Sequence, residues 1–277
     1  MSRFLQDMQN DGFSKVSNVF ASCECEELLE AAARMQRMAT GRHFTERFGN
    51  VRFFNNTTQN ELRSVIWCGL LDRRLEAFRR DARIFEVLSP LLGNTIRQVT
   101  NQIHFKQPGS LTSFPLHTDR SSRMRDQGPE IQHLENCFYQ VGIVAEKMSL
   151  LNGGMYFLPG SHVWSAESPY AKVAEMGRKP EADFADKMPE NCVAIEAEAG
   201  DVLVWSGDTV HGSALNQDPQ SHRVLYINGY VRGTDTLRGY WAWIDGIPVP
   251  LPSIDVPVLV YGDPDLHYFI DARRVFA

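Results

Sequence analysis

Two parts of the first third of the chain have apolar residues at the spacing of an amphipathic helix. One begins at Ser22, whose hydroxyl can cap the first turn, and Gly41 can end it. Its predicted buried stripe consists of five apolar residues: Leu28, Leu29, Ala32, Met35 and Met38. The other covers residues 71–93 and is interrupted by Pro90 and Gly93. We therefore expect a helical N-terminal part over about residues 1–93, with two helices on one side of a sheet.

After Gly93 the pattern changes to short segments rich in β-branched and aromatic residues, separated by glycine, proline and aspartate. These segments are TIRQVTNQIHF, NCFYQVGIVAE, GGMYFLPGSH, DVLVWSG and RVLYINGYV. Many short strands without regular intervening helices predict an antiparallel sandwich or jelly roll over about residues 94–235. The fold class is therefore mostly β with flanking helices.

The remaining segments fit one domain over residues 1–277. Residues 164–191 contain three prolines and are expected to leave the strand core as an excursion. The C-terminal extension, residues 236–277, is rich in aromatic residues and proline, and we expect it to pack on the core.

Composition and charge narrow the classes of molecule that this protein is expected to bind. The chain has 277 residues, 43% of them hydrophobic, and a formal charge of −6 without long blocks of either sign, which argues against general nucleic-acid binding. Its start, MSRFLQDMQNDGF, lacks the features of a signal peptide, and no stretch is apolar enough for a bilayer. Five scattered cysteines without a CxxC pair fit a reducing compartment. We expect a cytoplasmic protein without a membrane partner, and a homo-oligomer is left open.

A candidate metal site comes from the stretch FPLHTD. His117 and Asp119 are separated by one residue, so on a strand both side chains point to one face. His211, far later in the chain, follows the strand-like DVLVW and is a candidate third ligand, because distant strands of a jelly roll can face each other. Two histidines and one carboxylate suit iron(II) and leave positions free for chemistry. An H-x-D pair alone is weak evidence, since most such pairs lie on a solvated surface.

Two residues that follow His211 in the chain, Ser213 and Arg223, strengthen this interpretation. The planar guanidinium of Arg223 suits a bidentate grip on a carboxylate, and the Ser213 hydroxyl can add to it. A 2-oxoglutarate-dependent oxygenase needs such a combination. The metal chelates the keto acid end of 2-oxoglutarate, and an arginine binds its distal carboxylate.

Three stretches, FKQPGSLTSFPLHTD, NGGMYFLPGSH and GDVLVWSGDTVHGSALN, occur in this order before Arg223. They resemble the motifs of the phytanoyl-CoA dioxygenase family. The members of this family are non-haem iron(II), 2-oxoglutarate-dependent oxygenases. The resemblance covers roughly residues 90–235. It implies a double-stranded β-helix core, a cupin-like jelly roll. The implied iron ligands are His117, Asp119 and His211, and the implied residues of the 2-oxoglutarate site are Arg223, Ser213, Phe114, Lys106 and, more loosely, Gln102.

The activity implied by the resemblance is hydroxylation of an unactivated C–H bond with release of succinate and CO2. It would use Fe(II), 2-oxoglutarate and O2, with ascorbate as a reductant in vitro. Radical halogenases of related design lack the carboxylate ligand, so Asp119 favours hydroxylation. An acyl-CoA or natural-product hydroxylase or desaturase of the same family is the alternative, and a metal-binding jelly-roll pseudoenzyme is the alternative outside enzymes.

The substrate is indicated only by side chains near the ligands. Arg120, Arg123 and Arg125 follow Asp119 and could pair with a phosphate, phosphonate or carboxylate. We therefore favour a small anionic metabolite, such as an organophosphonate or an amino-acid derivative, as the small-molecule substrate. Aromatic residues that could shape the pocket are Tyr139, Trp205, Trp241 and Trp243.

Overall fold

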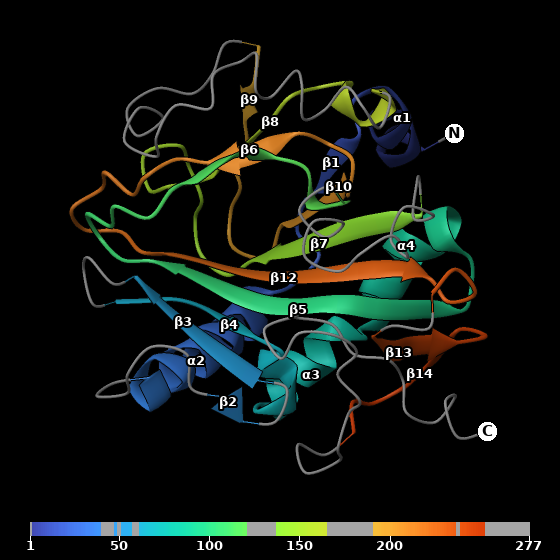
Figure 1. Cartoon of the computed structure of the whole chain (residues 1–277), viewed down its shortest axis with the longest axis horizontal. Helices are drawn as coiled ribbons and strands as arrows, with labels where there is room; N and C mark the ends of the chain where they lie inside the picture. The colour runs from blue at the N-terminus through green and yellow to red at the C-terminus, as the bar shows by residue number, and fades with distance from the viewer. Residues whose placement is uncertain are drawn as a thin grey trace.

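Two antiparallel sheets face each other in the computed structural model, which describes residues 2–39, 47–48, 51–56, 61–120, 137–164, 191–236 and 239–252 (Figure 1). The large sheet has the order β1 (Phe13–Val16), β10 (Val202–Ser206), β7 (Phe138–Val144), β12 (Arg223–Arg232), β5 (Ile96–Lys106), β4 (Glu61–Ile66), β3 (Val51–Asn56) and β2 (Arg47–Phe48), with β13 (Tyr240–Ile244) pairing β5 and β14 (Ile247–Pro248). The small sheet has the order β6 (Phe114–His117), β11 (His211–Ser213), β8 (Met155–Phe157) and β9 (Val193–Ala194). The predicted jelly roll is confirmed.

Three helices, α2 (Ser22–Ala39), α3 (Arg73–Arg79) and α4 (Ala82–Leu92), cover the large sheet on the side away from the small one (Figure 1). The other described helical elements are α1 (Arg3–Asn10), η1 (Cys68–Leu70) and η3 (Ser161–Val163). Helix α2 begins at Ser22 as predicted and buries Leu28 and Met35, while Leu29 and Met38 are only half-buried. The second helical region is two helices, because the Asp81 side chain accepts a hydrogen bond from Arg83 N at 2.9 Å and starts α4 anew.

The first third holds the predicted helices, but it is not helical throughout as the prediction of a helical part over about residues 1–93 implied, because β1 to β4 also lie there. In β3 the buried residues Val51 and Phe53 alternate with less buried neighbours, which is the period of a strand with one buried face. This alternation is too short to stand out in a region where helical spacing dominates. The described part of the C-terminal extension, residues 239–252, packs on the core as expected: β13 pairs with β5, and Trp243 is buried.

Each face of the large sheet has its own apolar core. The core on the helix side contains residues of α2, α3 and α4. The core between the two sheets includes Phe157 and Met155 from β8, facing Trp205, Leu225 and Ile227 from the large sheet. The functional side chains described below lie in this second layer. None of the helices in the described part of the chain is long and apolar enough to cross a membrane.

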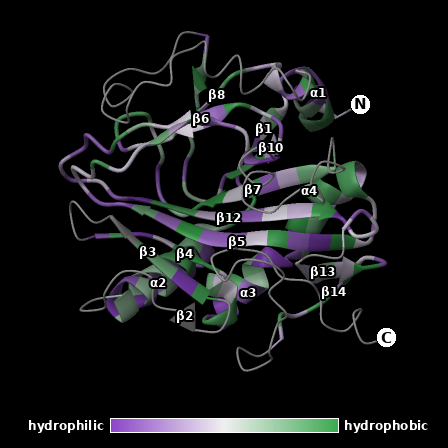
Figure 2. Cartoon of the chain, in the orientation of Figure 1, coloured by the Kyte–Doolittle hydropathy of each residue, from purple (hydrophilic) through white to green (hydrophobic). Residues whose placement is uncertain are grey.

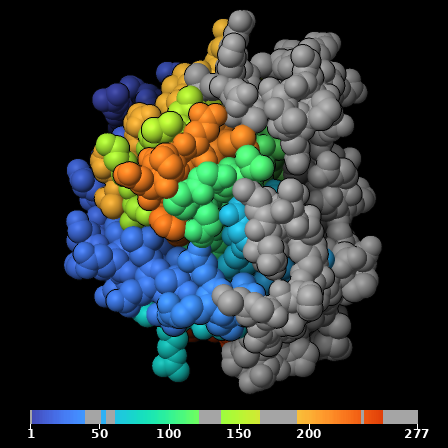
Figure 3. Space-filling view, turned by 90° about the vertical axis from the view of Figure 1, so that its left-hand side faces the viewer, coloured from blue at the N-terminus to red at the C-terminus, as the bar shows by residue number. Residues whose placement is uncertain are grey.

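The loops at one end of the two sheets are tied together by Asn216. Its Nδ2 donates to the carbonyl oxygens of Gln107 and Ser221, both at 2.8 Å, and Gln217 N donates to Leu151 O at 2.9 Å. Figure 3 shows these loops side by side on one face, in green, yellow-green and orange. They fix the ends of β5, β11 and β12, where Lys106, Ser213 and Arg223 lie.

A buried polar network joins α3 to the middle of the large sheet. Arg79 Nε donates to Gln98 Oε1 at 2.5 Å, and Gln98 Nε2 donates to Asn228 Oδ1 at 2.7 Å. The other nitrogens of Arg79 donate to the carbonyl oxygens of Trp241 and Val249, at 2.6 and 2.8 Å. Figure 2 shows hydrophilic positions along β5, the strand that contains Gln98. Arg79 thus fastens the C-terminal segment to the core.

We expect Arg79→Met to lower the free energy of unfolding by about 3–5 kcal/mol, because it leaves the buried Gln98 oxygen and two carbonyl groups without their donor. Arg80→Met is the matched control: Arg80 and Arg79 both pair with Glu76, at 2.7 and 3.4 Å, but Arg80 is partly exposed, so its loss should cost less than about 1 kcal/mol. Urea unfolding of both variants measures this. Equal costs would contradict the structural role of Arg79.

Candidate active site

The pairing of β6 with β11 brings two distant histidines together. His117 ends β6 and lies directly opposite His211, which begins β11, with 4.3 Å between the ring centroids. Asp119 lies two residues after His117, past the end of the strand and not on it as expected. One potential ligand atom from each residue lies within 4.8 Å of the others. Two imidazoles and a carboxylate so placed can hold a divalent metal ion, and iron(II) suits this donor set.

Backbone carbonyl groups set the tautomers of both histidines. His117 Nδ1 lies 2.8 Å from Pro115 O, and His211 Nδ1 lies 2.9 Å from Thr209 O. A carbonyl oxygen only accepts, so each Nδ1 carries a proton and donates it. Each Nε2 is then left with its lone pair, which is the form that binds a metal ion.

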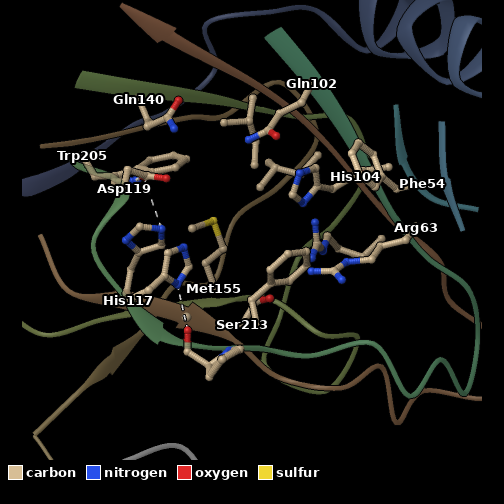
Figure 4. A pocket seen from close by; sticks show the side chains of 18 of the residues that line it. Phe54, Arg63, Gln102, His104, His117, Asp119, Gln140, Met155, Trp205 and Ser213 are labelled. Atoms are coloured by element: carbon tan, nitrogen blue, oxygen red, sulfur yellow. Dashed lines mark hydrogen bonds and ion pairs between the residues drawn. The ribbon is translucent and has the colours of Figure 1, made fainter. Parts of the chain in front are cut away.

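The opposite sheet holds the carboxylate. The indole Nε1 of Trp205, on β10, donates to Asp119 Oδ2 at 2.9 Å, and this oxygen lies 3.5 Å from His211 Nε2 (Figure 4). Trp205 is buried, and its ring lies 5.5 Å from that of His211. The indole therefore limits rotation of the carboxylate and presents it to the two imidazoles.

A group of cations lies at the other end of the site. Lys106 and Arg223 are register partners on β5 and β12, and both are buried. Lys106 Nζ donates to Ser213 Oγ at 2.8 Å and to Ala214 O. Arg223 Nε lies 3.3 Å from Gly153 O, whereas its buried Nη1 has no hydrogen-bond partner in the described part of the chain. Gly153 has a φ of +82°, and a Cβ there would lie 2.6 Å from the Lys106 side chain, so the turn needs glycine.

Burial shifts the titration of these cations. It lowers the pKa of Lys106 well below its usual range, and the nearby Arg223 and Arg63 lower it further. Burial also lowers the pKa of Arg223 to about 10, while Glu146 acts in the opposite direction. Grouped cations of this kind are stabilised by an anionic ligand. The guanidinium group with a partnerless nitrogen, beside the Ser213 hydroxyl, fits the distal carboxylate of 2-oxoglutarate.

A cavity of about 410 Å³ joins the two ends (Figure 4). Four of the residues predicted for the 2-oxoglutarate site line this cavity: Phe114, Gln102, Ser213 and Arg223. The fifth, Lys106, is not among the lining residues but donates a hydrogen bond to Ser213. Several lining residues are not predicted by any sequence motif: Phe54, Arg63, His104, Gln140 and Met155. Arg63 and His104 lie against the Phe114 ring, at 4.3 Å and 5.1 Å from its centroid.

Other predicted substrate residues are placed differently. Arg120 is buried in an ion pair with Asp208 and is not among the cavity-lining residues, so its placement does not support a substrate contact. Tyr139 packs against the core on the helix side, because neighbouring residues of β7 alternate and Gln140 takes the cavity side. Arg123 and Arg125 lie outside the described residues. Of the predicted aromatic residues, Trp205 lines the cavity, whereas Trp241 packs against Arg97 and Trp243 is buried in the helix-side core.

We expect Trp205→Phe to weaken binding of manganese(II), used as a redox-stable probe, by about 10- to 100-fold, because it removes the donor that orients Asp119. Calorimetric titration with the metal measures this. Trp243→Phe is the matched control, since it shrinks an equally buried indole outside the cavity lining. Equal metal affinity in the two variants would show that the indole N–H does not support the metal site.

Comparison with known proteins agrees with this geometry. The profile of the phytanoyl-CoA dioxygenase family (PhyH) matches residues 8–224. A probable alpha-ketoglutarate-dependent hypophosphite dioxygenase of Stutzerimonas stutzeri is 26% identical, over 79% of this chain and 74% of its own length. An ectoine dioxygenase of Bordetella bronchiseptica is 22% identical, over 78% and 70%.

A solved structure shares the fold. The crystal structure of EctD from S. alaskensis with bound Fe superposes with a TM-score of 0.66 at 18% identity, covering 85% of this chain and 78% of that one. The family profile extends over most of the chain, and within the matched range His117, Asp119 and His211 are close enough together that they could hold a metal ion. The chain therefore belongs to the phytanoyl-CoA dioxygenase family and is a non-haem iron, 2-oxoglutarate-dependent dioxygenase.

Proposed function

We propose that this dioxygenase hydroxylates an unactivated C–H bond of a small anionic metabolite, an organophosphonate or an amino-acid derivative. The products besides the alcohol would be succinate and CO2. The observation that carries the proposal is the excess of positive charge around the cavity. The relative from S. stutzeri, named for hypophosphite, a small phosphorus oxyanion, supports the same substrate class.

The net charge of the loaded site follows from the charges of its lining residues, the metal ion and 2-oxoglutarate. Arg63 and Arg223 line the cavity, and Asp119 is the one acidic residue among its described lining residues. Iron(II) adds two positive charges and 2-oxoglutarate two negative ones, which leaves roughly one positive charge without counting Lys106. A positive charge in a partly buried cavity attracts an anion and disfavours a cation. An anionic substrate therefore fits the loaded site best.

Each residue has a defined part in this proposal. His117, Asp119 and His211 hold iron(II), and Arg223 with Ser213 holds the distal carboxylate of 2-oxoglutarate. Iron(II) would supply the oxidising chemistry, in which O2 and 2-oxoglutarate are consumed and one oxygen atom enters the substrate.

The surrounding side chains orient the reactants and exclude water. Lys106 donates to Ser213 and so holds its hydroxyl toward the carboxylate. Leu225, Ile227 and Met155 form an apolar wall of the cavity, which keeps water away from the reacting carbon.

We expect His117→Ala to abolish iron binding. Arg223→Ala should keep the metal but weaken 2-oxoglutarate affinity by about 10- to 100-fold, because a charge-assisted hydrogen bond to the carboxylate is lost. Calorimetric titration of the manganese(II) protein with 2-oxoglutarate separates the two effects. If Arg223→Ala left the affinity unchanged, the assignment of Arg223 would fail.

We expect succinate formation by the protein with Fe(II), 2-oxoglutarate, ascorbate and O2 to be stimulated by small phosphonates or amino-acid derivatives, and not by matched cations such as betaine esters. Mass spectrometry should then show a product heavier by one oxygen atom. Stimulation by acyl-CoA thioesters alone would contradict the proposed substrate class and favour the alternative within the family. A wild-type protein that bound the metal but not 2-oxoglutarate would favour the metal-binding pseudoenzyme.

A further inference from the structure

The side chain of Gln140 is not explained by the chemistry described so far. It lies on β7, is 0% exposed, and lines the cavity. Neither its Oε1 nor its Nε2 has a hydrogen-bond partner in the part of the chain that the structure describes. A buried amide without partners is costly, at roughly 1–3 kcal/mol for each unpaired group. Such a cost is expected where a ligand supplies the missing partners.

Its location separates Gln140 from the 2-oxoglutarate end of the cavity. Gln140 pairs with Trp205 on β10 and with Gly229 on β12. Gly229 is six residues along β12 from Arg223, roughly 20 Å at the usual rise of a strand. 2-Oxoglutarate is much shorter than this, so the carboxylate that Arg223 would bind lies far from the Gln140 amide. In Figure 4, Gln140 lies beside Trp205 and Asp119, across the pocket from Arg63 and Ser213.

A glycine on the neighbouring strand β12 provides the space that the Gln140 amide occupies. A Cβ at Gly229 would lie 2.7 Å from Gln140 Oε1, so the absence of a side chain there lets the amide stand beside the strand. The cross-strand neighbour on the other side is Trp205, whose N–H is engaged with Asp119 and is not available to Gln140. The amide therefore keeps one donor group and one acceptor for a molecule in the cavity.

We propose that Gln140 binds the substrate next to the metal ligands, through one hydrogen bond donated by its Nε2 and one accepted by its Oε1. The substrate is then a small anion that also carries a primary carboxamide or a lactam, whose carbonyl oxygen and N–H lie on the same side and so match this pair. This inference rests on the proposed function and narrows its substrate class to amino-acid derivatives or phosphonates that bear a primary carboxamide or a lactam. Gln140 would be a specificity-determining residue, because an analogue without the N–H leaves Oε1 unpaired.

The test uses pairs of ligands that differ in one donor. Protein loaded with manganese(II) and the 2-oxoglutarate analogue N-oxalylglycine is titrated calorimetrically with pyroglutamate, a lactam, and with phosphonoacetamide, a primary amide. Each is compared with the matching ester that lacks the N–H: the lactone of 2-hydroxyglutarate and the methyl ester of phosphonoacetate. We expect wild-type protein to bind at least one amide about tenfold or more tightly than its ester, and Gln140→Leu to lose this preference. Gln140→Asn, which keeps a shorter amide, should retain part of it.

Two controls separate this role from a structural one. Thr100→Val removes a buried hydroxyl that also lacks a partner among the described residues but does not line the cavity, so it should not change the preference. Gln140→Leu should be at least as stable as wild type to thermal unfolding, because it removes an unpaired polar group. A marked fall in melting temperature would show that the amide serves the fold.

The remaining outcomes decide between the two proposals. If wild-type protein shows no preference for any amide over its ester, or if Gln140→Leu keeps the preference, the role of Gln140 is wrong while the dioxygenase assignment stands. If wild-type protein binds neither manganese(II) nor N-oxalylglycine, the proposed function itself fails. In Gln140→Leu, affinities for the metal and for N-oxalylglycine within about twofold of wild type confirm that the amide acts on substrate alone.

Discussion

The antiparallel pairing of β6 with β11 is the contact on which the site depends. It places His117 opposite His211, although the two lie far apart in the sequence. The other neighbour of β11 is β8, where Phe157 is the register partner of His211 and stacks on its ring. From the facing sheet, Trp205 reaches both His211 and Asp119. A metal site built this way forms only after both sheets have assembled, because its residues share no local segment.

Three buried polar side chains show how the fold and the site use such groups differently. Arg79 is fully buried but has a side-chain acceptor and two carbonyl acceptors, so its charge is used to join α3 to the sheet. Arg223 and Gln140 are equally buried, yet each has side-chain atoms without partners among the described residues, and both line the cavity. A buried polar atom without a partner lowers the stability of the fold. Such an atom is expected where a bound ligand supplies the missing hydrogen-bond partner.

The sequence predicted the parts of the fold and site that are encoded locally. The strands over residues 94–235 and helix α2 follow from short patterns of apolar residues, and the structure confirms them. The structure also brings together His117, Asp119 and His211, whose motif and order were the basis of the resemblance.

What the sequence did not predict depends on strand register. Gln140 and Tyr139 are neighbours, and only the pairing of β7 decides which of them faces the cavity. Arg63 and His104 reach the site because β4 pairs with β5, and the strand character of β4 was hidden in a region with helical spacing. Arg120 was placed near substrate on the basis of its position after a ligand, whereas the nearby acid Asp208 engages it in the folded chain.

The most direct test of the central claim is the visible absorption spectrum of the protein with iron(II) and 2-oxoglutarate in the absence of oxygen. Chelation of iron(II) by a keto acid produces a charge-transfer band that neither component shows alone. We expect wild-type protein to show this band, and Asp119→Ala to show it weakly or not at all at the same concentrations. A wild-type protein that lacked the band when saturated with both would contradict the assignment of a metal and 2-oxoglutarate site to this cavity.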